Sequence, residues 1–419
     1  MTPIALVDAN NFYASCEQVF DAKLTHRPVV VLSNNDGNII ARSKEAKALG
    51  IKMGEPVFKL YPTLVENNVE VLSSNYELYG DMSARVADVI RDFSPEVEVY
   101  SIDECFLSLD PSKTSLTEQG AAIRERVKRH TGIPVSVGIA TTKTLAKIAN
   151  YHAKRSVKAD GCVDLTNSPY LNLALERTPV EDVWGVGQRY AEMLELQGIT
   201  NALELRNAPD EFIRDRMTVV GLRTVHELRG IRCHPLELTA ATRKSVMVSR
   251  SFGSAVETLP ELKSALAFYV ARAAEKLRRE QLVAGSLNVF ISTNRFNHEP
   301  QYSNSMTMNL APMSDNNFEL TALALHGLIT IFRPGYRYKR AGVLLANLMP
   351  AENLTMRLWD NEENERMKKL MATLDELNDK FGRDAVKCGM FSLHSKWRTR
   401  FSKRSPRYTT KWNELMIVT

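Results

Sequence analysis

The pattern of apolar and polar positions changes along the chain and predicts at least two kinds of structure. Continuous apolar runs at residues 3–8 and 134–140 predict buried strands, and periodic stretches at 76–93, 116–130 and 142–155 predict helices. Strands and helices alternate through residues 3–165, which predicts an α/β domain with a mixed sheet.

Two adjacent acids lie at a bend in this region. Residues 99–109 predict a strand, a tight turn and a second strand, with Asp103 and Glu104 at an exposed tip, and the first apolar run ends in Asp8. We expect these three carboxylates to share one site. Hard divalent cations take oxygen ligands, so the acids predict a two-metal phosphoryl-transfer site. An Asp-Glu pair in a turn is more often simply solvated, and the arrangement also fits cyclases and nucleases.

The predicted helix 142–155 carries a lysine stripe opposite its apolar face. A solvated lysine face is the commoner interpretation, and a stripe facing phosphates is the alternative. In the second interpretation, positive charge for a triphosphate comes from Lys154 of this helix and from a short basic segment that carries Lys44 and Lys47.

After residue 178 the predicted order of helices and strands differs from the alternation seen in residues 3–165. Residues 178–230 predict helices joined by short turns. Gly185 and Gly187 precede one of these helices, whose N–H groups suit a DNA phosphate; an ordinary glycine-containing turn is the alternative. Residues 245–348 follow a βαββαβ order, with a basic first helix for which DNA contact and solvation both remain open. Residues 396–411 hold seven Lys or Arg and no acid, interleaved with aromatics. They suit single-stranded nucleic acid or a protein partner, with a disordered tail as the alternative.

Composition limits the class of protein. A chain of 419 residues predicts two to four domains, and its net charge of +5 permits a polyanionic partner. Five scattered cysteines without a Cys-x-x-Cys pair argue against a disulfide framework or structural zinc. The sequence shows no signal peptide and no apolar run long enough for a bilayer, so we expect a cytoplasmic protein without membrane contact.

Several long strings are distinctive: residues 8–17 (Asp-Ala-Asn-Asn-Phe-Tyr-Ala-Ser-Cys-Glu), 28–37, 45–50, 73–79, 100–104 (Tyr-Ser-Ile-Asp-Glu), 142–147, 249–253, 271–278 and 405–410. Together they resemble the Y-family translesion DNA polymerases, and most closely their UmuC-type catalytic subunits. The resemblance covers nearly the whole chain.

The resemblance implies an α+β, mixed α/β multidomain fold shaped as a right-hand polymerase. Its expected parts are a palm (1–27 and 75–168), small fingers (28–74), a helix-hairpin-helix-like thumb (169–235), a linker (236–243), a βαββαβ little finger (244–349) and a partner-binding tail (350–419).

The resemblance also implies roles for individual residues. Asp8, Asp103, Glu104 and the backbone carbonyl of Ala9 are expected to hold two Mg²⁺ ions, with Mn²⁺ able to substitute. The dNTP is expected to contact Asn11, Phe12, Lys44, Lys47, Lys154 and Tyr13, the last as the steric gate against a ribose 2′-hydroxyl. Contacts to primer-template DNA are expected from Gly185, Gly187, Arg250, Arg272 and Lys276.

Two positions depart from the family's pattern. Many members have tyrosine where Lys44 stands, and the sliding-clamp peptide lacks its glutamine in Thr355-Met-Arg-Leu-Trp359. Leu358 and Trp359 are therefore expected to bind the replication clamp through a weakened motif. The other implied partners are a cleaved UmuD-type dimer and a RecA-type recombinase filament.

These expectations predict an error-prone translesion DNA polymerase in SOS-type damage tolerance, associated with the nucleoid. A nucleotide cyclase is one rival, although cyclases need no DNA clamp such as residues 178–349 would form. A non-catalytic repair regulator that binds DNA or a recombinase is the other, and the presence of all three acids argues against it.

Overall fold

The chain forms two compact units. The computed structural model describes residues 2–239, 242–353, 362–382, 385–387 and 397–415. One unit comprises residues 1–240 and 402–419, and the other comprises residues 241–401. The division falls inside the predicted linker, whereas the predicted tail is shared between the two units.

The first unit is built on a mixed five-stranded sheet in the order β5-β6-β1-β7-β8. Its central strand β1 (Ile4–Ala9) is buried along its whole length and runs antiparallel to both neighbours. The other strands are β5 (Val97–Val99), β6 (Glu104–Ser108), β7 (Val135–Ala140) and β8 (Cys162–Asp164). The mixed sheet expected from the alternating pattern is confirmed.

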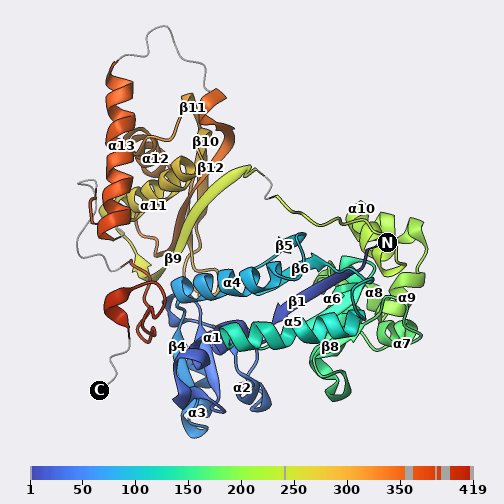
Figure 1. Ribbon diagram of the computed structural model, residues 1–419. Coiled ribbons are helices and arrows are strands. Elements are labelled where there is room, and N and C mark those ends of the chain that lie inside the picture. The colour runs from blue at the N-terminus through green and yellow to red at the C-terminus, as the bar shows by residue number, and fades with distance from the viewer. Residues whose placement is uncertain (1, 240–241, 354–361, 383–384, 388–396, 416–419) are drawn as a thin grey trace. The chain divides into compact units, whose positions relative to one another are not determined.

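Helices cover both faces of this sheet. Helices α4 (Tyr76–Arg91) and α5 (Leu116–Thr131) lie side by side on one face (Figure 1), and α6 (Lys143–Arg155) packs on β1 and β7. The approach of α6 is close, because a Cβ on Gly138 would lie 2.3 Å from the backbone oxygen of Ala146. Side chains alternate along a strand, so the face of β1 that carries Ile4 and Leu6 also carries Asp8.

A smaller sheet, in the order β3-β2-β4, follows β1 in the sequence. Its strands are apolar where they are buried, and they pack against the short helices between them. The elements are α1 (Phe12–Phe20), β2 (Val29–Leu32), β3 (Ile39–Arg42), α2 (Lys44–Ala48), α3 (Val57–Glu66) and β4 (Glu70–Ser73), with 3₁₀ turns at Ala22–Leu24 and Asn34–Asp36.

A helical region completes the first unit. It contains α7 (Leu171–Glu176), α8 (Gln188–Glu195), α9 (Ala202–Asn207) and α10 (Asp210–Leu228), with 3₁₀ turns at Val157–Ala159 and Val180–Asp182. The fully buried Glu227 of α10 accepts hydrogen bonds from the backbone N–H of Thr144, Cys233 and His234. This carboxylate therefore joins the helical region to the start of α6, and losing it would leave buried donors unpaired.

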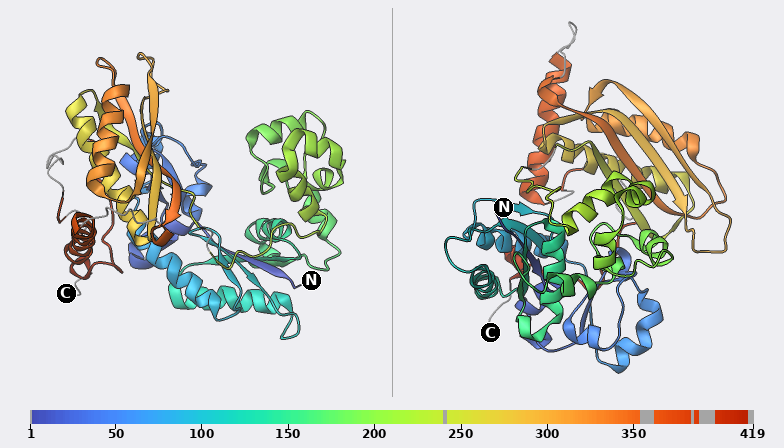
Figure 2. Two further views of the ribbon diagram at one scale, coloured as in Figure 1. Left: turned by 90° about the horizontal axis from the view of Figure 1, so that it is seen from above. Right: turned by 90° about the vertical axis from the view of Figure 1, so that its right-hand side faces the viewer.

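The second unit is a four-stranded antiparallel sheet in the order β11-β10-β12-β9 with α11 and α12 packed on one face (Figure 2). The elements are β9 (Ser245–Val256), α11 (Leu259–Arg279), β10 (Leu282–Thr293), β11 (Ser303–Ser314), α12 (Asn317–Ile331) and β12 (Tyr338–Pro350). The predicted βαββαβ order is confirmed.

Helix α13 (Glu362–Phe381) is attached to α11 by charge. The guanidinium of Arg278 donates to both carboxylate oxygens of Asp375 at 2.6 and 2.8 Å, and Arg279 pairs with Asp379. These two arginines of the basic helix thus have a structural role. In the part of the chain that the structure describes, no helix is both long and apolar enough to cross a membrane.

Candidate active site

The three predicted acids lie together at one edge of the central sheet. Asp8 and Glu104 are register partners on adjacent strands, and the backbone N–H of Ala9 donates to the Asp103 carbonyl at 2.8 Å. The expectation of an exposed tip was wrong: Asp8 is 9% exposed, and Asp103 and Glu104 are half-buried. The reason is α6, which covers this face of the sheet.

The lysine stripe of α6 faces these acids. Lys154 Nζ lies 2.6 Å from an Asp8 oxygen, and Lys147 Nζ lies 2.6 Å from a Glu104 oxygen. Spacings of four and seven residues along a helix bring such side chains to one face. The commoner interpretation of the stripe, a solvated lysine face, is therefore wrong for these positions.

The electrostatics of Asp8 call for a cation. Burial raises its pKa, Lys154 lowers it by charge and hydrogen bonding, and the carboxylates of Glu104 and Asp103 raise it further. In the described ranges, no three acidic, histidine or cysteine side chains form a ready ion-binding cluster. The donor set is nevertheless all oxygen and strongly anionic, which fits a hard divalent ion.

The predicted nucleotide-contact residues start at the turn after β1. Asn11 adopts the left-handed conformation (φ 53°), which asparagine tolerates, and α1 begins at the next residue. Phe12 is buried, whereas Tyr13 is half-buried. Burial, then Tyr76 and Asp103, raise the pKa of the Tyr13 hydroxyl. Tyr13 therefore lies within electrostatic range of the acids.

Aromatic stacking holds the Tyr13 ring. Its centroid lies 4.3 Å from that of Tyr79 with the rings 15° apart, and Tyr76 meets both rings edge-on. No role was predicted for Tyr76 and Tyr79, although both lie in the string 73–79 that carries the resemblance. That string was the available signal.

The predicted fingers lysines differ in their surroundings. Burial lowers the pKa of Lys47, and so do the charges of Arg42 and Lys154, while Asp8 raises it. Lys47 thus belongs to a cationic group beside the acids, to which Arg42 is an addition that sequence reasoning missed. Lys44 begins the same short helix and is exposed; within the described residues it makes no hydrogen bond or ion pair with the acids.

The two predicted thumb glycines have different conformations. Gly185 has a φ of +92°, and a Cβ there would lie 2.9 Å from the Thr224 hydroxyl oxygen. Gly187 is the N-cap of α8. Gly185 also lines a cavity of about 640 Å³ with Trp184 and Tyr100.

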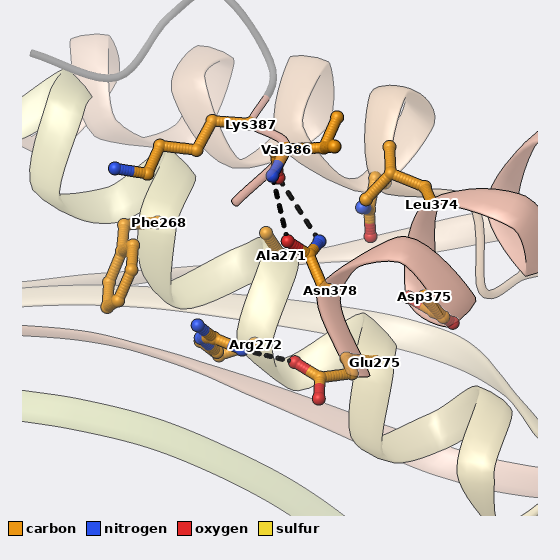
Figure 3. A pocket seen from close by; sticks show the side chains of 10 residues that line it. Phe268, Ala271, Arg272, Glu275, Leu374, Asp375, Asn378, Val386 and Lys387 are labelled. Carbon is orange, nitrogen blue, oxygen red and sulfur yellow. Dashed lines mark hydrogen bonds and ion pairs between the residues drawn. The ribbon is translucent and has the colours of Figure 1, made fainter. Parts of the chain in front are cut away.

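The predicted DNA contacts of the second unit gather on the helix side of the edge strand β9. Arg250, Arg272 and Lys276 line a cavity of about 460 Å³ with Trp397. Arg272 donates to Glu275 at 2.6 Å beside a smaller pocket that α13 also lines (Figure 3). Leu358 and Trp359, the predicted clamp residues, lie outside the described residues.

Comparisons with known proteins agree with this geometry. Residues 7–151 match the impB/mucB/samB family and residues 243–358 match the C-terminal domain of that family. Protein UmuC of Salmonella typhimurium is 43% identical over 419 residues, covering 99% of this chain and 99% of its own length. This chain belongs to the impB/mucB/samB family.

Two more distant matches of this UmuC-type chain are DNA polymerases. DNA polymerase IV of Pelotomaculum thermopropionicum is 28% identical over 92% of the chain and 94% of its own length. A Y-family DNA polymerase chimera of Dbh and Dpo4 superimposes with a TM-score of 0.66 at 20% identity, covering 83% of this chain and 99% of its own length. The expected Y-family polymerase fold is confirmed, and polymerases of this family depend on metal ions.

The last part of the UmuC-type chain has a match of its own. Residues 368–418 match a family described as a domain of unknown function. This range contains residues 368–381 of α13, in the second unit, and the segment 402–415, which belongs to the first unit.

Proposed function

We propose that this chain is an error-prone translesion DNA polymerase that adds deoxynucleotides to a primer opposite damaged bases, in SOS-type damage tolerance and mutagenesis. The observation that carries the proposal is the register pairing of Asp8 with Glu104, each held by a lysine of α6, in a UmuC-type chain. In the reaction the primer 3′-oxygen attacks the α-phosphorus of the dNTP, and pyrophosphate leaves.

The acids would hold the metal ions. Carboxylates of Asp8, Asp103 and Glu104, with the backbone carbonyl of Ala9, would bind two Mg²⁺ ions, and Mn²⁺ would also fit this all-oxygen set. Bound ions of this kind favour the ionised hydroxyl and neutralise phosphate charge. Burial and the neighbouring carboxylates raise the pKa of Asp8, so a bound cation would relieve a repulsion already present.

The lysines would bind the triphosphate. Lys154 is half-exposed and pairs with Asp8, so its ammonium can move to a phosphate when an ion takes its place. Lys47 is within electrostatic range of Lys154 and Arg42. Beyond the effect of burial, their positive charges lower the pKa of Lys47, and a bound polyanion would offset this repulsion. Lys44 remains a further proposed contact at the start of the same helix.

Tyr13 would exclude ribonucleotides. Its ring is fixed by stacking on the buried Tyr79, and the charge of Asp103 acts on its hydroxyl. In this proposal the ring would lie beside the sugar of a nucleotide bound at the acids. Because packed aromatic rings are rigid, the Tyr13 ring would not move aside, and a ribose 2′-hydroxyl would clash with it. Asn11 and Phe12 would line the same nucleotide.

The remaining predicted roles concern DNA and the division of the chain. Backbone N–H groups at Gly185 and Gly187 would contact phosphates, and Arg250, Arg272 and Lys276 would add cationic contacts. The division that we propose is palm (1–27 and 75–168), fingers (28–74), thumb (169–235), linker (236–243), little finger (244–349) and tail (350–419).

The partners that we propose follow from the family. They are primer-template DNA, dNTP, a cleaved UmuD-type dimer, a RecA-type filament and, through Leu358 and Trp359, the replication sliding clamp. With such partners, the chain would act at the nucleoid in the cytoplasm.

Primer extension across an abasic site tests the proposed function. With Mg²⁺, a UmuD-type dimer and a RecA-type filament present, the chain should add dNTP, and Asp103→Asn should not. Asp110→Asn is the matched control, because Asp110 is an exposed carboxylate beyond the same hairpin. No incorporation by the unaltered chain would overturn the polymerase proposal, and cyclic nucleotide formed from NTP would favour a cyclase.

A cellular assay separates the polymerase from a non-catalytic repair regulator that binds DNA or a recombinase. If cells carrying Asp103→Asn tolerate DNA damage as well as cells with the unaltered chain, the regulator becomes the better explanation. Loss of tolerance at an equal protein level supports the polymerase.

A further inference from the structure

The C-terminal segment 402–408, which we call the strap, lies on the first unit and contacts residues that are 330 to 388 positions away in the sequence. It forms a bridge at the end of β4, where the Ser73 backbone N–H donates to the Lys403 carbonyl at 3.0 Å. The Ser402 hydroxyl donates to Asp36 at 2.6 Å. In Figure 1 the segment runs beside β4 and the adjoining end of α4.

The strap is also bound at the start of α4. The amide nitrogen of Asn75, the N-cap of that helix, donates to the carbonyls of Ser405 and Pro406 at 3.1 and 3.0 Å. The ring of Tyr408 stacks on Phe20 of α1 at 5.0 Å. Contacts with two helices, strand β4 and the 3₁₀ turn Asn34–Asp36 give the strap one defined position.

A buried carboxylate connects the strap to the nucleotide site. Glu17 of α1 is 2% exposed, and one of its oxygens accepts from the Ser405 hydroxyl at 3.0 Å and from the Tyr79 hydroxyl at 2.6 Å. Burial raises the pKa of Glu17, and these two hydrogen bonds lower it. A buried carboxylate needs such donors, so the loss of one would loosen the position of the side chain.

The same chain of contacts reaches Tyr13. The Tyr79 ring, held at one end by Glu17, stacks on Tyr13 at 4.3 Å. No part of the nucleotide need touch Glu17 or Ser405 for them to influence where the Tyr13 ring stands. Small displacements of a positioning group are known to change selectivity and rate strongly.

We propose that the strap is a positioning element for sugar selection, acting from Ser405 through Glu17 and Tyr79 on Tyr13. It deepens the proposed function and rests on the gate role of Tyr13. Ser405, Glu17 and Tyr79 are positioning residues, because none of them is placed to touch the substrate. Part of the family of unknown function at residues 368–418 thereby gains a role in this chain.

The test measures discrimination, as the ratio of kcat/KM for dCTP to that for rCTP in single-nucleotide insertion by the full chain with its partners. Ser405→Ala and Tyr79→Phe each remove one donor to Glu17 and should lower the ratio by about three- to tenfold. Ser405→Thr keeps a hydroxyl and should restore it. Ser402→Ala, on the same strap but bonded to Asp36, is the matched control and should leave the ratio within about twofold.

Two results would overturn the inference. The first is an unchanged ratio in both Ser405→Ala and Tyr79→Phe; if the two kcat/KM values fall equally, so that their ratio stays the same, the residues have a merely structural role. The second is a Ser405→Ala effect that persists undiminished in a Tyr13→Ala background. If Ser405→Ala fails to fold, Tyr79→Phe and Glu17→Gln decide.

The single variant Tyr13→Ala distinguishes a failure of the gate role from a failure of the strap inference. If it admits rCTP while Ser405→Ala and Tyr79→Phe change nothing, the gate stands and the strap inference falls. If Tyr13→Ala leaves the ratio unchanged in an active polymerase, the gate role and the inference fall together, while dNTP incorporation itself still stands.

Discussion

The two ends of α6 carry the same kind of ion pair in opposite surroundings. At the first end, Lys143 and Glu98 lie 2.5 Å apart with side chains 4% and 6% exposed. At the last end, Lys154 and Asp8 lie 2.6 Å apart with side chains 34% and 13% exposed. From helix geometry alone, Lys143 and Lys154 would be expected to have similar surroundings.

Their neighbours make the difference. Glu98 also accepts from the backbone N–H of Glu237 at 2.8 Å, so its charge is buried and well bonded. Asp8 instead faces Glu104 and Asp103, whose charges raise its pKa. A lysine-carboxylate pair therefore does not by itself indicate a catalytic acid, and the proposed role of Asp8 rests on the neighbouring carboxylates instead.

The strongest test of this contrast is Asp8→Asn. Primer extension should fall on the order of 10³-fold or more, because a charge that stabilises the transition state is lost. Thermal stability should stay the same or rise, since the change removes a buried charge repelled by two neighbours. Single-turnover extension and a melting curve measure the two effects. An active Asp8→Asn variant, or one that melts early, would contradict the contrast.

Glu98→Gln should give the opposite result. Breaking a buried pair from one side leaves Lys143 without its partner and should cost about 3–5 kcal/mol of unfolding free energy. Urea unfolding measures this loss. The double variant Glu98→Gln/Lys143→Met is the control, and it should recover most of the stability, because it removes the orphaned charge as well. Extension per folded molecule should change by no more than a few fold.

Lys154→Met tests the more exposed ion pair, at the last end of α6, by its effect on the use of dNTP. The loss of one charge-assisted contact should lower kcat/KM for dNTP by about 10- to 100-fold. Its stability should change little, because the pair is partly solvated. Lys158→Met is the matched control, since Lys158 is exposed in the 3₁₀ turn just after α6. An equal effect of both variants on KM would mean that only the overall charge matters.

The sequence predicted the elements of this region better than their surroundings. The apolar run before Asp8, the hairpin with Glu104 and the helix with Lys154 were all placed correctly, because each depends on local periodicity. Periodicity shows which side chains share a helix face, but it does not show what lies opposite. The partner of Lys143 is Glu98, which is 45 residues away in the sequence and lies on strand β5.

The strap shows the same limit over a longer range. Ser405 and Glu17 are 388 residues apart, and no pattern near either residue indicates the other. The basic, aromatic segment 396–411 predicted a nucleic-acid or protein partner, whereas its described part from Ser402 contacts this chain's own first unit. Such contacts depend on how distant segments pack, which single-sequence periodicity does not contain.

The smallest predicted effect concerns the apolar face of α6. His152 Nε2 lies 2.8 Å from the Ala174 carbonyl oxygen and 3.0 Å from the Thr178 hydroxyl oxygen. Burial lowers the pKa of His152 below its usual 6.5; Arg155 and Arg177 lower it further, and the bond to Ala174 raises it. The unfolded chain therefore takes up this proton first as the pH falls.

The direction of this pKa shift predicts how the stability of the chain changes with pH. The contribution of His152 to stability is complete above pH 6.5 and is lost as the pH falls toward the depressed value. Urea unfolding from pH 7.5 to 5.5 should show a steeper loss for the unaltered chain than for His152→Gln. Parallel slopes would show that His152 accepts a proton in place, without loss of stability.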